Sequence, residues 1–268
     1  MDYRIIVLDI DGTLTNSQKE ISAPTREGLI EIQERGYKVV LASGRPQQGV
    51  EGLADELKLD KYGSYILCFN GGRIINCKTK EIVYEKTYSK SNLPIIYKVA
   101  MEFGTGLMTY RGDDIILATA PDQYIELESR INGMPMVRPD NFFEFVDFDL
   151  NKCILTGEPE VLVKAEKRLN SIFNQYLNVY RSEPFFLEVM PQKIDKAHSL
   201  LKLLGSLGLN SDQMVCCGDG FNDITMLECA GLGVAMENAQ DLVKEAADYI
   251  TGSNDENGIV QVIEKFFK

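Results

Sequence analysis

The residues with the clearest chemical potential lie near the N-terminus, where two aspartates follow a short apolar run. Ile5–Leu8 is apolar throughout, and Asp9, Asp11 and Thr13 come directly after it, with glycine at position 12. Four consecutive apolar residues predict a buried strand, and in an extended segment residues i and i+2 point to the same side. Asp9 and Asp11 can therefore serve one site. An Asp-Gly turn that closes a β-hairpin is the alternative interpretation of this segment.

Polar residues also follow three other predominantly apolar segments of the chain, each predicted as a strand. The run at 37–42 leads into Ser43, Gly44 and Arg45, the run at 65–69 into Asn70 and Gly71, and the run at 214–217 into Asp219, Asn222 and Asp223. Strands separated by helical segments predict a parallel sheet, and the carboxyl ends of parallel strands open on one edge. Taken singly, these segments are also typical of turns and helix caps. Their occurrence at successive strand ends favours one shared site.

The charges of this predicted site require a cation. Asp9, Asp11, Asp219 and Asp223 would bring four carboxylates into one crevice, and like charges about 4 Å apart repel by on the order of 4 kcal/mol at an effective dielectric of 20. Mg²⁺ suits oxygen-only ligands, whereas zinc and copper favour softer ones. Lys196, which begins the helix predicted before the last run, adds further positive charge. Together these groups predict a phosphoryl-transfer site.

The same residue types suggest a division of roles within that site. A carboxylate can accept a phosphoryl group and later release it to water, which makes Asp9 the candidate nucleophile. Asp11 is the candidate acid/base, which would protonate the leaving alcohol and deprotonate the attacking water. Thr13, Ser43 and backbone N–H groups beside glycines such as Gly44 can hold phosphate oxygens.

Composition excludes several classes of partner. The chain has 268 residues, is 44% hydrophobic and 25% charged, and carries a formal net charge of −12. Binding to nucleic acid or to an anionic membrane is therefore not expected, because both require basic surfaces. The six cysteines form no CxxC pair, and the chain shows neither a signal peptide nor an apolar run long enough to span a membrane. A reduced, cytoplasmic protein is the expectation.

The chain has two similar ends and a different middle. The first and last thirds alternate strands and helices, whereas the middle is richer in aromatic residues and turn signals. There, residues 115–118, 152–155 and 185–189 are predicted as strands and residues 91–103 and 160–173 as helices. We interpret residues 84–186 as an inserted α+β domain, because insertions are tolerated where two loop ends lie close together. Residues 1–83 and 187–268 would then form one α/β core.

Four segments together resemble the motifs of a known superfamily. Asp9-Ile-Asp-Gly-Thr, Ser43-Gly-Arg, Lys196 and Gly218-Asp-Gly-Phe-Asn-Asp are similar to the four motifs of the haloacid dehalogenase superfamily of phosphatases. The segments that begin at Phe69, Phe186, Val234 and Ser253 resemble its Cof-like sugar-phosphatase subfamily. Glu237 departs from that subfamily, which usually has glycine there. The resemblance implies a Rossmann-like parallel-sheet core with an inserted α+β cap domain that closes over the site.

The resemblance also implies specific residue roles. Asp9 would be nucleophile and Mg²⁺ ligand, and Asp11 would be acid/base and bind the metal through its backbone carbonyl. Asp219 would bind Mg²⁺, with Asn222 and Asp223 as further metal ligands or as supports of the metal site. Ser43 and Lys196 would bind the phosphate. Arg45, Asn70 and Gly71 would line the substrate pocket, and Asn238 is a further candidate for that pocket or for a structural role.

The function expected from residues and resemblance is hydrolysis of a small phosphorylated metabolite with Mg²⁺. Sugar phosphates, nucleotides, flavin mononucleotide and pyridoxal phosphate all fit this expectation. A phosphomutase, which returns the phosphoryl group to a sugar, and a metabolite-binding regulatory protein with little turnover are the alternatives. The protein is expected to be a monomer or a weak homodimer.

Overall fold

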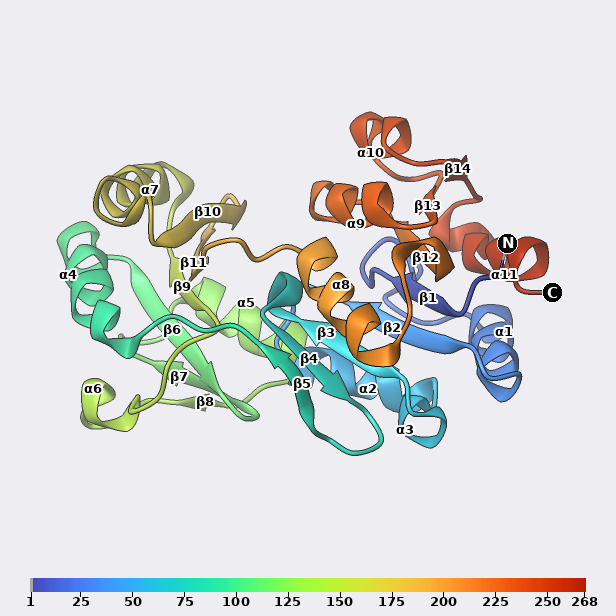
Figure 1. Ribbon diagram of the computed structural model, residues 1–268. Helices are drawn as coiled ribbons and strands as arrows, with labels where there is room; N and C mark the ends of the chain where they lie inside the picture. Colours follow the sequence, from blue (N-terminus) through green and yellow to red (C-terminus); the bar gives the residue numbers. More distant parts are fainter. Residues whose placement is uncertain (1) are drawn as a thin grey trace. The chain divides into compact units, whose positions relative to one another are not determined.

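The computed structural model describes residues 2–268, which divide into two compact units (Figure 1). The core unit comprises the chain up to Arg45, Val50–Tyr84 and Asp195–Lys268. The inserted unit comprises Pro46–Gly49 and Glu85–Ile194. Each unit has its own sheet, so the two are described separately.

The core unit is built on an eight-stranded sheet in the order β14-β13-β12-β1-β2-β3-β4-β5. Its strands are β1 (Ile5–Leu8), β2 (Lys38–Ala42), β3 (Tyr65–Cys68), β4 (Arg73–Asn76), β5 (Ile82–Glu85), β12 (Met214–Gly218), β13 (Leu232–Ala235) and β14 (Tyr249–Ile250). The six strands from β14 to β3 are parallel, and β4 runs antiparallel to β3. All four residues of β1 are buried, as expected for a central strand covered on both faces.

The helices of this part of the chain are α1 (Ala23–Glu34), α2 (Gln48–Glu56), α3 (Leu59–Tyr62), α8 (Lys196–Leu207), α9 (Ile224–Cys229), α10 (Asp241–Glu245) and α11 (Gly258–Phe266). Helix α1 packs with α11, and α8 packs with α9 (Figure 1). Ser22 is the predicted N-cap of α1, and its side chain accepts a hydrogen bond from Thr25 N. Such a cap satisfies an N–H group that the first turn leaves open.

The inserted unit holds a six-stranded sheet in the order β10-β11-β9-β6-β7-β8. Its elements are α4 (Leu93–Phe103), β6 (Gly106–Arg111), β7 (Asp114–Leu117), α5 (Gln123–Asn132), β8 (Met136–Val137), α6 (Phe142–Phe145), β9 (Cys153–Thr156), α7 (Pro159–Phe173), β10 (Leu177–Glu183) and β11 (Phe186–Pro191). Helices α4 and α7 pack together. Their apolar faces form one cluster with alternate residues of the sheet, such as Leu107, Leu155 and Leu187.

The C-terminal boundary of the inserted unit differs from the one read from the sequence. The sequence placed residues 187–268 in the core. In the structure, β11 pairs with β9 and β10 along Phe186–Pro191, so a break at 186 would cut through a strand. The boundary lies after this strand, at Ile194. A strand segment by itself does not specify which sheet it will join, because its pairing depends on residues elsewhere in the chain.

The mixed α/β class expected from the sequence is confirmed, with a parallel sheet in the core unit and an antiparallel-rich sheet in the insertion. The sequence did not identify β6, β10 or α5, which lie in the region of many turn signals. No helix among residues 2–268 is long and apolar enough to cross a membrane.

Candidate active site

The candidate site lies where the order of the core strands reverses. From β1 the chain continues to β2 and β3 on one side of it, and the later strands β12, β13 and β14 are added on the other. Such a switch point opens a crevice at the carboxyl ends of the strands. Asp9 follows β1 and Asp219 follows β12, and these two strands pair in parallel register, with Leu8 beside Cys217. The topology thus brings together residues more than 200 positions apart.

Lys196 connects two of the predicted carboxylates. It is the first residue of α8 and is fully buried. Its Nζ lies 2.5 Å from Asp9 Oδ1 and 2.6 Å from Asp223 Oδ1. A buried ammonium is costly without compensation, and here two carboxylates provide it. The structure thus brings together three of the residues that the sequence assigned to one site, Asp9, Lys196 and Asp223.

Asp223 also fixes the loop that follows β12. Its Oδ2 accepts hydrogen bonds from Asp219 N at 3.0 Å and from Gly220 N at 2.9 Å. Both of its carboxylate oxygens are therefore engaged, one by Lys196 and one by the backbone. Asp223 orients the lysine and shapes the loop that presents Asp219.

Asp219 is held from the side of β1. Thr13 Oγ1 donates a hydrogen bond to Asp219 Oδ1 at 2.8 Å. Gly12, which has φ of +87°, lies against the same carboxylate, and a Cβ at this position would lie 2.8 Å from Asp219 Cγ. Only glycine permits both this backbone conformation and this close approach. The predicted phosphate ligand Thr13 thus contacts a carboxylate of the site.

Burial and repulsion between carboxylates alter the titration of the cluster. Burial, together with the charges of Asp223 and Asp219, raises the pKa of Asp9 to about 8, although Lys196 acts in the opposite direction. Burial also raises the pKa of Asp219 to about 6, with Asp223 contributing, against the hydrogen bond from Thr13. Burial would lower the pKa of Lys196, but its two carboxylate partners outweigh this and raise it. The carboxylates of this cluster therefore call for additional positive charge.

The donor set fits a hard divalent cation. One ligand atom from each of Asp9, Asp219 and Asp223 lies within 4.8 Å of the others. Within residues 2–268, the second oxygens of Asp9 and Asp219 accept no hydrogen bond, whereas Asp223 is fully engaged. Oxygen-only ligands are those that Mg²⁺ prefers. Asp9 and Asp219 are thus the carboxylates best suited to direct contact with the ion.

The loops after β2 and β3 are joined by backbone hydrogen bonds. Asn70 N donates to Ser43 O at 2.9 Å, and Phe69 N donates to Arg45 O at 3.0 Å. Phe69, Asn70 and Gly71 all have positive φ, at 54°, 52° and 103°. This conformation is unfavourable for a bulky residue such as phenylalanine, and backbone strain of this kind is concentrated at functional sites. The joined loops place Ser43, Arg45 and Asn70 together at one edge of the site.

Ser199, which the sequence analysis did not single out, anchors this strained turn. Its fully buried side chain donates a hydrogen bond from Oγ to Gly71 O at 2.6 Å. Ser199 lies on α8, three residues after Lys196. A Cβ on Gly71 would lie 2.6 Å from both Asp195 O and Ser199 Oγ. One helix thus carries the buried lysine and supports the turn with Asn70. A serine within a helix has no distinctive spacing, so the sequence offered no signal for it.

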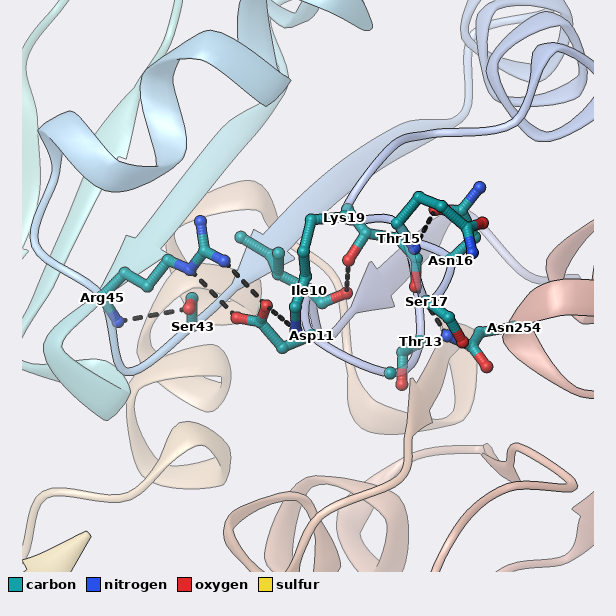
Figure 2. Close-up of polar contacts among 12 residues, drawn as sticks. Ile10, Asp11, Thr13, Thr15, Asn16, Ser17, Lys19, Ser43, Arg45 and Asn254 are labelled. Atoms are coloured by element: carbon teal, nitrogen blue, oxygen red, sulfur yellow. Dashed lines mark hydrogen bonds and ion pairs between the residues drawn. The ribbon is translucent and has the colours of Figure 1, made fainter. Parts of the chain in front are cut away.

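Asp11 is held by two cations (Figure 2). Arg45 donates from Nε to Asp11 Oδ2 at 3.0 Å and from a terminal nitrogen to Oδ1 at 2.7 Å. Lys19 Nζ, a partner that the sequence did not predict, lies 2.8 Å from the same Oδ1. Burial raises the pKa of Asp11, but the hydrogen bonds and charges of Arg45 and Lys19 outweigh it, so the pKa lies below its usual value.

Asn222 and Asn238 make contacts of different kinds. Asn222 Nδ2 donates to Asn70 Oδ1 at 3.2 Å, which links the loops after β12 and β3. Asn238 Nδ2 donates to Gly12 O at 2.8 Å, and its Oδ1 accepts from Asn254 N. The observed contact of Asn238 therefore supports the loop after β1, which is the structural one of its two predicted roles.

The sequence matches a known family model and relatives of similar length. The model for haloacid dehalogenase-like hydrolases matches residues 6–263. The protein YxeH from Bacillus subtilis is 31% identical over 98% of this chain and 98% of its own length. The 5-amino-6-(5-phospho-D-ribitylamino)uracil phosphatase YcsE from the same organism is 31% identical over 98% of this chain and 95% of its own length.

Solved structures with the same fold agree with this match. A haloacid dehalogenase-like hydrolase from Bacteroides thetaiotaomicron is 44% identical, with a TM-score of 0.96 over 99% of this chain and 100% of that one. A protein from Thermotoga maritima is 29% identical, with a TM-score of 0.88 over 98% of this chain and 97% of that one.

Proposed function

Because this chain belongs to the haloacid dehalogenase-like hydrolases and is a phosphatase of that family, we propose that it uses Mg²⁺ and an aspartyl-phosphate on Asp9 to hydrolyse a small phosphorylated metabolite. The observation that carries the proposal is the contact of buried Lys196 with Asp9 at 2.5 Å, beside the carboxylate of Asp219. This arrangement combines a nucleophilic oxygen, a fixed cation and a metal-binding carboxylate.

Asp9 and Asp219 would hold the metal ion. Each of these two side chains has one carboxylate oxygen that accepts no hydrogen bond from residues 2–268. In addition, Lys196 alone does not balance the negative charge of the carboxylate cluster. When bound, Mg²⁺ would neutralise this charge and polarise the phosphoryl oxygens. Asp223 would contribute indirectly, by holding Lys196 and the loop of Asp219 in place.

The phosphate would be bound chiefly by Ser43 and Lys196. Ser43 is 3% exposed, and its Oγ accepts a hydrogen bond from Arg45 N. A hydroxyl also has one proton to donate, and for Ser43 no acceptor for it is found among residues 2–268. Ser43 can therefore donate to a phosphoryl oxygen, and Lys196 can add its charge. The backbone N–H of Gly44 is a further proposed phosphate contact. The Thr13 hydroxyl is another, and it would exchange its hydrogen bond to Asp219 Oδ1 for one to the phosphate.

The reaction would proceed in two half-reactions on this chain's residues. In the first, an Asp9 carboxylate oxygen forms a bond to phosphorus while the bond from phosphorus to the leaving oxygen breaks. Asp11 donates a proton to that leaving oxygen, because an alkoxide is a poor leaving group. In the second, Asp11 removes a proton from water, the water oxygen bonds to phosphorus, and the bond to Asp9 breaks. Inorganic phosphate and the alcohol are the products.

Arg45, Asn70 and Gly71 are the proposed residues of the substrate pocket. The strained turn and its backbone hydrogen bonds support this, because they join the turn of Asn70 to the loop that carries Ser43 and Arg45. The name of one relative includes a ribitylaminouracil phosphate, which supports a small phosphorylated metabolite as the substrate class for this chain.

A panel of phosphorylated metabolites, assayed for phosphate release with Mg²⁺ and with EDTA, tests the proposal. We expect release from at least one small monoester, dependence on Mg²⁺ and loss of turnover in Asp9→Asn. Substantial turnover by Asp9→Asn would remove Asp9 as the nucleophile. Isomerised sugar phosphate without phosphate release would identify a phosphomutase, and an inert panel together with tight metabolite binding would identify a regulatory protein.

A further inference from the structure

Three hydrogen bonds fix the orientation of the Asp11 carboxylate. Arg45 contacts both oxygens, and Lys19 Nζ contacts Oδ1 at 2.8 Å. The Asp11 side chain is 40% exposed and the Arg45 side chain only 19%. A half-exposed aspartate without partners would sample several rotamers. These two cations limit it to the one orientation that Figure 2 shows.

Lys19 reaches Asp11 because its backbone adopts an unusual conformation. Its φ is 63°, which is unfavourable for a residue with a Cβ. A tight turn holds it there, since Asn16 Oδ1 accepts hydrogen bonds from Gln18 N and Glu20 N, at 3.0 Å each. Asn16 O also accepts from Lys19 N at 2.9 Å. The inference from such an outlier runs from the observed strain to a role for the residue.

The C-terminal region anchors this turn to the core. Ser17 donates from its backbone N and its Oγ to the two carboxylate oxygens of Asp255, at 2.8 and 2.6 Å. Asn254 Nδ2 donates to Thr15 O at 2.8 Å, a contact drawn in Figure 2. Contacts from residues far along the chain thus hold the turn that aims Lys19.

We propose that Lys19 is a positioning residue for Asp11, which together with Arg45 orients the carboxylate so that Oδ2 faces the reacting oxygen. Ionised carboxylate oxygens offer about four acceptor positions. Two on Oδ1 are taken by Lys19 and Arg45, and one on Oδ2 by Arg45. The remaining position on Oδ2 is the one available to the leaving group or to water. This inference rests on the acid/base role of Asp11 in the proposed function.

The test compares two substrates that differ mainly in the basicity of the leaving oxygen. Phenyl phosphate needs more help from a general acid than 4-nitrophenyl phosphate does, and kcat/KM reports the step in which the leaving group departs. Lys19→Met should lower kcat/KM about fivefold for phenyl phosphate and less than about twofold for 4-nitrophenyl phosphate, as for the loss of one exposed ion pair. Lys19→Arg, which keeps a donor, should restore most of the loss.

The matched control is Lys58→Met. Lys58 also has a left-handed backbone, with φ of 53°, and among residues 2–268 its ammonium has no hydrogen-bonding partner. Lys58→Met should leave kcat/KM unchanged for both phenyl phosphate and 4-nitrophenyl phosphate. Equal losses for the two substrates in Lys19→Met, or no loss, would overturn the inference.

A double-mutant cycle separates the inference from the proposed function. In an Asp11→Asn background, Lys19→Met should have no further effect on the residual kcat/KM for phenyl phosphate, the substrate for which the wild-type background shows the fivefold loss. A further loss equal to that in the wild-type background would show that Lys19 acts elsewhere. If Asp11→Asn keeps wild-type turnover of phenyl phosphate, the acid/base role of Asp11 itself fails. If Asp11→Asn is impaired but Lys19→Met is not, only the inference about Lys19 fails.

Discussion

Replacement of Lys196 by methionine tests whether the buried ammonium stabilises the site. Lys196 is fully buried and bridges Asp9 and Asp223 at 2.5 and 2.6 Å. Methionine has a similar length and no charge, so the substitution removes the cation with little change in packing. Two buried carboxylates would then lack their counter-charge.

The expected loss is large compared with the stability of a typical domain. Removal of one partner from a buried ion pair costs about 3–5 kcal/mol, whereas the free energy of unfolding of a domain is about 5–15 kcal/mol. The loss should depend on pH. Burial raises the pKa of Asp9 to about 8 even with Lys196 present, and without the lysine it would rise further. A protein that folds with Asp9 protonated loses stability as the pH rises up to the folded-state pKa of Asp9. Because that pKa is higher in Lys196→Met, the variant continues to lose stability above about pH 8, where the wild type no longer does.

Urea unfolding followed by circular dichroism would measure this loss, with EDTA and with Mg²⁺, at about pH 6 and pH 9. We expect the deficit of Lys196→Met to be larger at the higher pH and to shrink with Mg²⁺, because the ion would replace part of the lost charge. Lys152→Met is a matched control. Lys152 forms a buried ion pair with Glu188 at 3.0 Å in the inserted unit. Lys152→Met should therefore lower the free energy of unfolding by an amount that Mg²⁺ does not restore.

The reasoning would be refuted if Lys196→Met with EDTA unfolded within about 1 kcal/mol of the wild type at pH 7.5, a difference typical of an exposed pair. It would also be refuted if Mg²⁺ rescued Lys152→Met as fully as Lys196→Met, because the effect of the ion would then be unspecific.

Three further predictions concern the affinity for Mg²⁺, the hydrogen bond from Ser199 to Gly71 and the contact between Gly12 and Asp219. Mg²⁺ affinity, measured by calorimetry, should rise between about pH 5.5 and pH 8.5, because the raised pKa values of Asp219, about 6, and Asp9, about 8, mean that protons compete with the ion. Ser199→Ala should lower the free energy of unfolding by about 1–3 kcal/mol and raise KM, because it leaves the carbonyl of Gly71 without its donor. Gly12→Ala should abolish Mg²⁺-dependent turnover in a phosphate-release assay, because its Cβ would lie 2.8 Å from Asp219 Cγ at a φ of +87°.

Each of these has a clear contrary outcome. Affinity for Mg²⁺ that stays constant with pH would mean that the ion does not bind the protonatable carboxylates. Unchanged stability and KM in Ser199→Ala, with Ser206→Ala as a control for an exchange on the same helix, would remove the proposed support of the strained turn. Wild-type turnover by Gly12→Ala would show that the loop can move away from Asp219 at little cost.

Local patterns predicted where the residues of the candidate site lie along the chain. An apolar run that ends in Asp9 and Asp11 indicates a buried strand with its polar residues at one end, because buried carboxylates need compensation. The same logic applied to Ser43 and to Asp219, whose strands end at Ala42, as predicted, and at Gly218, one residue later than predicted. Alternation of strands and helices was sufficient for the parallel core.

Other features depended on contacts between distant parts of the chain. The C-terminal boundary of the insertion lies later than the sequence predicted, because strand β11 pairs with β9 and β10. The sequence of one segment does not specify which strands it will pair with. The links from Ser199 to Gly71 and from Asn254 to Thr15 join residues 128 and 239 positions apart. Ser199 carries no periodic or motif signal, and the segment that begins at Ser253 does not indicate that Asn254 contacts Thr15.

The sequence by itself determined which groups could do chemistry, since side-chain type and strand position are local properties. The tertiary structure alone decided how those groups divide their work. Both oxygens of Asp223 are engaged by Lys196 and the backbone, whereas Asp219 keeps one oxygen without a hydrogen bond among residues 2–268, although both are aspartates in one loop. Asp11 is oriented by Lys19 and Arg45. A hydrogen bond depends on distances of a few tenths of an ångström, which are set by the packing of the whole core unit.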